Sequence, residues 1–127
     1  PRFYKKKTSA WIQTIARKHR ADFLEVSYVF CSDAYLLSIN QQFLNHNTLT
    51  DIITFRLSKK GAPIEAEIYI STERVAENAL SFRSTKDTEL HRVIIHGILH
   101  LIGFKDKKPT DKALMRKKEE ACLSLRK

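Results

Sequence analysis

The chain has 127 residues, a formal net charge of +9 and a hydrophobic fraction of 43%, with only three glycines and three prolines. This length and composition suit a single folded domain spanning 1–127, and they exclude a disordered or fibrous chain. No apolar run is as long as a membrane-spanning helix, and the basic N-terminus lacks the apolar segment of a secretion signal. We therefore expect a cytoplasmic protein with no membrane partner, whose two cysteines, Cys31 and Cys122, are free thiols.

The positive charge is concentrated at the two ends of the chain. Residues 1–20 carry seven Lys or Arg residues and no acid, and residues 105–127 carry nine bases and four acids. The segment between them has a small net negative charge. Basic ends of this kind attract polyanions, of which RNA is the commonest in the cytosol. Charge alone is equally consistent with basic residues that serve only solubility.

Hydrophobic periodicity and turn residues predict helices and strands in alternation. In chain order we expect a helix over 8–20 capped by Thr8 or Ser9, a strand over 23–30, a helix over 33–43, a hairpin of strands 51–57 and 64–70, a helix over 72–82 capped by Ser71, a helix over 88–102 that begins at Thr85 or Asp87 and ends at Gly103, and a basic amphipathic helix from 109 onward. This order favours an α+β fold in which a small mixed sheet is packed with about five helices.

The predicted helix over 88–102 carries two histidines one turn apart. His96 and His100 are separated by four residues and lie about 40° apart around a largely apolar helix. Such a pair can bind one divalent ion, although the spacing alone is also common in surface and core histidines. Gly103 permits a sharp turn, and the next acid is Asp106, so we predict Asp106 as the third ligand. Three protein ligands leave one coordination position open, as in a catalytic zinc site.

Three further residues bear on this hypothesis. Gly97 occupies the position at which a zinc peptidase of the His-Glu-x-x-His type has its general base, which disfavours that activity. Because glycine inside a helix costs about 1 kcal/mol relative to alanine, we expect substrate or backbone to approach closely there. His91 lies too far around the helix to share the ion, and we predict a surface position for it. His46, in a polar loop, is a weaker candidate for a general acid.

The segment from His96 to Phe104, His-Gly-Ile-Leu-His-Leu-Ile-Gly-Phe, closely resembles the signature of the YbeY family of bacterial endoribonucleases. Leu44-Asn45 with the segment Thr50-Asp-Ile-Ile-Thr-Phe55 is similar to the family's second motif, and Glu67-Ile-Tyr-Ile-Ser71 is similar to the strand that follows it. The resemblance implies a zincin-like metal-dependent hydrolase with one zinc ion that cleaves single-stranded RNA. It also implies a part in 3′-end processing of small-subunit rRNA and in ribosome quality control, with the small subunit as a partner.

The sequence departs from the family pattern at three places. Asp106 stands where the family has a third histidine, and two histidines with one carboxylate also suit manganese or iron. The family's arginine between the asparagine and the Thr-Asp motif is absent, and Arg56 is a nearby base whose face of the strand is not assigned by the pattern. Ala66 replaces a glycine.

We therefore expect metal-assisted hydrolysis of RNA. Thr50 and Asp51 are candidates for orienting water, or equally for a hydrogen bond at the start of a strand. The candidates for contacts with the RNA backbone are basic residues, namely Lys5, Lys6, Lys7, Arg17, Lys18, Arg20, Lys105 and Lys107. Two rival functions fit the same residues: a metal-dependent hydrolase of a non-nucleic substrate, and a ribosome-binding factor with a structural metal. The sequence does not indicate the oligomeric state.

Overall fold

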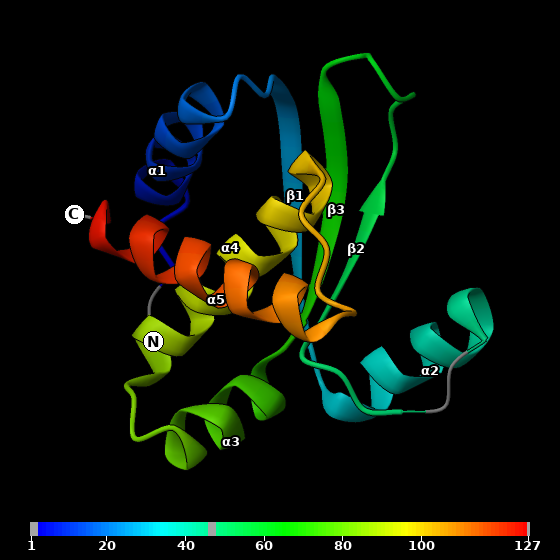
Figure 1. The fold of residues 1–127 in the computed structure, drawn as a ribbon. Coiled ribbons are helices and arrows are strands. Elements are labelled where there is room, and N and C mark those ends of the chain that lie inside the picture. The colour runs from blue at the N-terminus through cyan, green and yellow to red at the C-terminus, as the bar shows by residue number, and fades with distance from the viewer. Residues whose placement is uncertain (1–2, 46–47, 127) are drawn as a thin grey trace.

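Alternating apolar residues on three strands build a mixed sheet at the centre of the molecule (Figure 1). The structure is a computed structural model that describes residues 3–45 and 48–126, so His46 lies outside the described residues. The elements are α1 (Lys5–Lys18), β1 (Phe23–Cys31), α2 (Asp33–Leu44), β2 (Ile52–Arg56), β3 (Ile64–Ser71), α3 (Thr72–Ser81), α4 (Lys86–Ile102) and α5 (Pro109–Ser124). The central strand β3 pairs in parallel with β1 and antiparallel with β2. The predicted α+β fold is confirmed.

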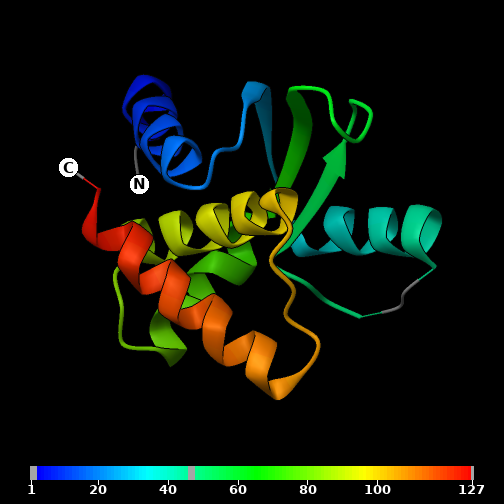
Figure 2. The same cartoon turned by 45° about the horizontal axis from the view of Figure 1, so that its top comes forward.

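The two faces of the sheet are covered unequally. On one face, Ile68 and Ile70 of β3 join the main core, together with side chains of α1, α3, α4 and α5. On the other face, Tyr69 packs with Ile53 and Phe55 of β2 against α2. Figures 1 and 2 show α2 on the opposite side of the sheet from the other helices. Because strand side chains alternate between faces, β2 contributes to both layers, with Ile52 on the side of α4.

Helix α4 is the most deeply buried helix of this core. Its residues Ile94, Ile95, Ile98 and Leu99 have no solvent exposure. Burial of these four side chains removes most of the apolar surface of α4 from water, which holds the helix in one orientation. Of the helices among residues 3–45 and 48–126, not one has the length and apolar character needed to cross a membrane.

Side-chain caps begin three helices, and those at Ser71 and Thr85 are the ones that the sequence predicts. The hydroxyls of Ser32, Ser71 and Thr85 accept hydrogen bonds from backbone N–H groups at the starts of α2, α3 and α4. The predicted cap of α1 is wrong, since the helix begins at Lys5 and Thr8 lies inside it. The Thr8 hydroxyl donates to the carbonyl of Tyr4 one turn back, so it does not cap the helix.

The predicted surface position of His91 is also wrong. His91 is 6% exposed, and its ring meets the edge of the Trp11 ring at 5.8 Å between centroids. Its Nδ1–H donates to the carbonyl of Asp87 at 2.7 Å. Burial lowers the pKa of His91 below its ordinary value. This histidine is therefore a satisfied core residue, placed there because α1 covers that flank of α4.

Gly97 allows β2 to lie directly against α4. A Cβ atom at this position would lie 2.8 Å from Ile52 Cδ1 and 2.8 Å from Thr54 Cγ2. The close approach predicted from the glycine is thus made by side chains of β2 and not by backbone. It brings an edge strand of the sheet alongside the helix that carries both histidines.

We expect Gly97→Ala to destabilise the fold by about 1 kcal/mol. Overpacking against Ile52 and Thr54 costs about 1–3 kcal/mol, and the better helix propensity of alanine returns about 1 kcal/mol. Urea unfolding measures the difference. In an Ile52→Val/Thr54→Ser background, which removes both close methyl groups, the same change should be neutral or stabilising. Equal destabilisation in both backgrounds would show that this contact is not the reason for the glycine.

Candidate metal centre

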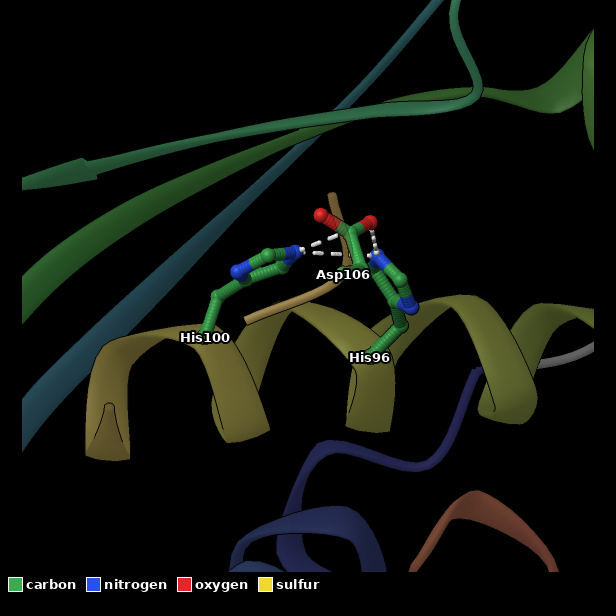
Figure 3. Close-up of side chains that lie close together, drawn as sticks. All are labelled: His96, His100 and Asp106. Atoms are coloured by element: carbon green, nitrogen blue, oxygen red, sulfur yellow. Dashed lines mark hydrogen bonds and ion pairs between the residues drawn. The ribbon is translucent and has the colours of Figure 1, made fainter. Parts of the chain in front are cut away.

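Three side chains from two adjacent segments converge on one point (Figure 3). His96 and His100 project from successive turns of α4, and Asp106 projects from the loop that follows. His96 Nε2 lies 3.2 Å from Asp106 Oδ2, and His100 Nε2 lies 3.3 Å from the same oxygen. The two Nε2 atoms are 3.1 Å apart. The three predicted ligand residues are therefore brought together.

The spacing of these three atoms matches the geometry of a tetrahedral ion. Metal–nitrogen and metal–oxygen bonds of about 2.0–2.1 Å place neighbouring tetrahedral ligand atoms about 3.3 Å apart. The side chains of His96, His100 and Asp106 are 24%, 34% and 37% exposed, so the group is open to solvent on one side. The donor set therefore fits a divalent ion with a free coordination position. Two imidazoles and a carboxylate suit zinc, manganese or iron, so the donors do not identify the metal.

The end of α4 determines where Asp106 lies. Gly103 has a φ of +126°, and its N–H donates to the carbonyls of Leu99 and His100. The N–H of Phe104 also donates to the Leu99 carbonyl, at 3.0 Å. A positive φ is inexpensive for glycine, so the chain can reverse directly after the helix. This reversal brings Asp106 back over the histidines, as the sequence predicts.

A buried carboxylate on α5 holds His96 from behind. Glu119 is 3% exposed, and its Oε2 lies 2.6 Å from His96 Nδ1. Its other oxygen accepts from Arg92 Nη1 at 3.1 Å, and Arg92 also forms a two-point ion pair with Glu89. A histidine that binds a metal through one ring nitrogen commonly donates the N–H of its other ring nitrogen to a carboxylate.

Sequence reasoning missed Glu119 and Arg92. The sequence predicts a basic amphipathic helix from 109 onward, and this pattern does not distinguish Glu119 from the other charged residues of the helix. A local signal does exist, because Met115, Glu119 and Cys122 follow helical spacing and all three are buried. An acid within such an apolar stripe requires a buried partner.

A cleft of about 640 Å³ opens from the three side chains toward β2 and the end of α2. Both Thr50 and Asp51 line it, as do Arg92 and Gly97. Asp51 is largely buried, accepts from Asn78 Nδ2 at 3.4 Å, and has a pKa raised above the usual value by burial. The Thr50 hydroxyl donates to the Ile52 carbonyl, which is the hydrogen bond expected at the start of a strand.

The base that sequence alone did not assign lies away from this cleft. Arg56 donates from Nη2 to the carbonyls of Lys59 and Ala62, so it stabilises the hairpin turn. Among the described residues that line the cleft, Arg92 is the one Lys or Arg side chain. Arg56 therefore adds no positive charge to the lining of this cleft.

The basic residues predicted to contact RNA are all exposed. Six of them lie on α1 or directly after it and do not line the cleft, whereas Lys105 and Lys107 flank Asp106 in the loop after α4. Their contact with RNA stays a prediction.

The charges around His96 favour its protonated form. Burial opposes protonation of the ring, but the hydrogen bond to Glu119 and the charges of Glu119, Asp106 and Asp51 outweigh it. Together they raise the pKa of His96 above its ordinary value of 6.5. Metal binding requires the neutral ring, so protons compete with the ion below this raised pKa.

We therefore expect the affinity for Zn²⁺ or Mn²⁺ to fall as the pH decreases, with the decline beginning above pH 6.5. Below the pKa of His96 the ion must displace one proton from the ring, so the affinity should fall about tenfold for each unit of decrease in pH. Competition with a chromophoric chelator at a series of pH values measures this slope. An affinity that does not change between about pH 6 and pH 8 would contradict the assignment of His96 as a ligand.

Comparisons with known proteins identify the family of this chain. The profile of the family described as Endoribonuclease YbeY matches residues 2–126. A protein of Cytophaga hutchinsonii named Endoribonuclease YbeY is 53% identical over 117 residues, which cover 92% of this chain and 82% of that protein. A protein of the same name from Flavobacterium psychrophilum is 50% identical, with coverage of 91% and 81%. A Thermotoga maritima solution structure superposes with a TM-score of 0.66 at 30% identity, over 94% of this chain and 79% of that one. The chain therefore belongs to the YbeY endoribonuclease family.

Proposed function

We propose that this protein is a metal-dependent endoribonuclease that cleaves single-stranded RNA during rRNA maturation. We further propose that it acts in the cytoplasm on the 3′ end of small-subunit rRNA, in contact with the small subunit, and in ribosome quality control. The observation that carries the proposal is the convergence of His96, His100 and Asp106 at tetrahedral spacing beside an open cleft. Membership of an endoribonuclease family supplies the substrate class.

His96, His100 and Asp106 would hold the ion, for which we propose zinc. A divalent ion bound there supplies Lewis acidity toward a phosphate oxygen and toward water. The carboxylate of Asp106 reduces the net positive charge of such a site compared with three neutral histidines. The same donor set would also accept manganese or iron.

The cleft carries more negative than positive charge before an ion is bound. Asp51 and Asp106 line it and Glu119 lies directly behind His96, whereas Arg92 supplies one positive charge. A phosphodiester would be repelled by this set of charges, so its approach to the site depends on the cation. The exposed bases of α1 and of the loop after α4 would attract the rest of the RNA strand.

Asp51 is the side chain best placed to assist water. It lines the same cleft as His96, and burial raises its pKa toward the range of a useful general base. The amide of Asn78 donates to Oδ2 and fixes the orientation of the carboxylate. Thr50 donates its hydroxyl hydrogen to a backbone carbonyl, and we propose that it orients the start of β2.

Asp106→Ala should lower both the metal content and the cleavage of single-stranded RNA. Loss of one of three ligands should weaken metal binding by more than the roughly 10–100-fold that follows loss of a ligand's hydrogen-bond partner. Elemental analysis of purified protein, paired with a cleavage assay on single- and double-stranded RNA, measures both effects. Asp111→Ala, which removes an acid from the first turn of α5, is the matched control.

The outcomes separate the proposal from its rivals. Unchanged metal content in Asp106→Ala would remove this residue from the site. Metal-loaded wild-type protein that ignores RNA but hydrolyses esters or amides would favour a hydrolase of non-nucleic substrates. RNA or ribosome binding that survives His100→Ala, in a protein that never cleaves RNA, would favour a binding factor with a structural metal. One observation favours this last function. Arg92 lines the cleft, but it is paired with two carboxylates and so has little charge left to stabilise a phosphate during cleavage.

Asp51→Asn should reduce the rate of RNA cleavage while the metal content stays at the wild-type level. A positioned base contributes typically about 10²–10⁴-fold to a rate, and the amide keeps the shape of the carboxylate without its basicity. Single-turnover cleavage with the metal-loaded variant tests this role. A rate within a fewfold of wild type would leave Asp51 with only a structural part.

A further inference from the structure

We infer that Glu119 and Arg92 are positioning residues that select the tautomer of His96. Glu119 would keep the proton of the neutral ring on Nδ1, and Arg92 would fix which oxygen of Glu119 faces the ring. The inference rests on the proposed metal-binding role of His96. It is tested on the metal-free protein, however. The inference can therefore fail while the RNA activity is confirmed, and it can hold in a protein that does not cleave RNA.

The first step is the contact between His96 and Glu119. An ionised carboxylate only accepts hydrogen bonds, so the distance of 2.6 Å between Nδ1 and Oε2 requires the hydrogen to lie on Nδ1. The neutral ring then carries its lone pair on Nε2, which is the atom that faces His100 and Asp106. The ring is therefore prepared for an ion at the convergence point before any ion arrives.

The second step is the contact between Glu119 and Arg92. Arg92 lies on α4 one turn before His96, and its Nη1 donates to Glu119 Oε1 at 3.1 Å. The remaining side of the guanidinium is held by both oxygens of Glu89, which is 1% exposed. Arg92 is thus fixed on its own helix, and it presents one N–H to a defined oxygen of Glu119.

These contacts also define what Arg92 does not do. Two of its nitrogens are engaged by Glu89 and the third donates to Glu119, and its side chain is 17% exposed. A guanidinium paired with two buried carboxylates has little attraction left for an RNA phosphate. Arg92 therefore lies beside the cleft because it holds Glu119, which in turn contacts His96.

The third step is the effect of replacing Glu119 by glutamine. A glutamine has one carbonyl oxygen, and the charged Arg92 donor competes for it more strongly than the neutral ring. The amide NH₂ would then face His96 Nδ1, which must accept, so the ring proton moves to Nε2. The hydrogen on Nε2 would point at Asp106 and occupy the place of the metal.

The experiment is two-bond ¹H–¹⁵N correlation NMR of the histidine rings in metal-free protein, above the pKa of His96. Wild type should show His96 with its proton on Nδ1, and Glu119→Gln should show it on Nε2. Zinc affinity, measured by chelator competition, should fall about 10–100-fold in the same variant. Glu120→Gln, which changes the exposed neighbour on α5, should leave the tautomer and the affinity unchanged.

A second background isolates the role of Arg92. Glu89→Gln/Arg92→Met removes the guanidinium and neutralises the carboxylate of Glu89 with which it pairs, so in this background the glutamine at position 119 is free to turn its oxygen toward the ring. There Glu119→Gln should leave the proton on Nδ1 and lower the zinc affinity by less than threefold. Equal losses in both backgrounds would refute the role of Arg92. A wild-type His96 protonated on Nε2 would refute the role of Glu119, and this result does not depend on any variant folding.

Discussion

The burial of α4 against the sheet is the constraint on which the site depends. Its four fully buried aliphatic residues and the contact of Gly97 with β2 allow the helix one orientation and leave little room for rotation. A rotation of the helix would carry His96 and His100 into the core or away from the loop that bears Asp106. The same packing places β2 beside the histidines. The contact between α4 and β2 therefore belongs to the hydrophobic core and also forms part of the cleft. Close packing of this kind gives the precision that metal ligands need.

Buried charge is the second element of the arrangement. Glu89, Arg92 and Glu119 connect α4 to α5 through paired side chains, and the chain of contacts ends at the ring of His96. Buried ion pairs add little stability by themselves because of their desolvation cost. Their value here is geometric, since each pair fixes the direction of the next donor. As a result, Nδ1 of His96 is held by buried side chains, whereas the ring also lines the open cleft.

Much of this arrangement can be predicted from local sequence signals, and the features that cannot be predicted depend on contacts between distant segments. The period of four between His96 and His100 and the glycine at 103 are local signals, so the helix, its end and the return of Asp106 are predictable. The caps at Ser71 and Thr85 are local in the same way. The burial of His91 is not local, because it depends on α1 covering that flank. Glu119 lies 23 residues from His96, and only the packing of α5 on α4 brings the two together. Strand alternation alone does not place Arg56, because carbonyls of the hairpin turn hold its guanidinium.

The central claim is that His96, His100 and Asp106 bind one ion together. Anomalous diffraction from crystals of the metal-loaded protein tests it most directly. The account predicts a single strong peak about 2.0–2.2 Å from Nε2 of both histidines and from an oxygen of Asp106, with Glu119 still against Nδ1 of His96. A peak at another place, or an ion held through Nδ1 of His96 with the Asp106 carboxylate turned away, would contradict it.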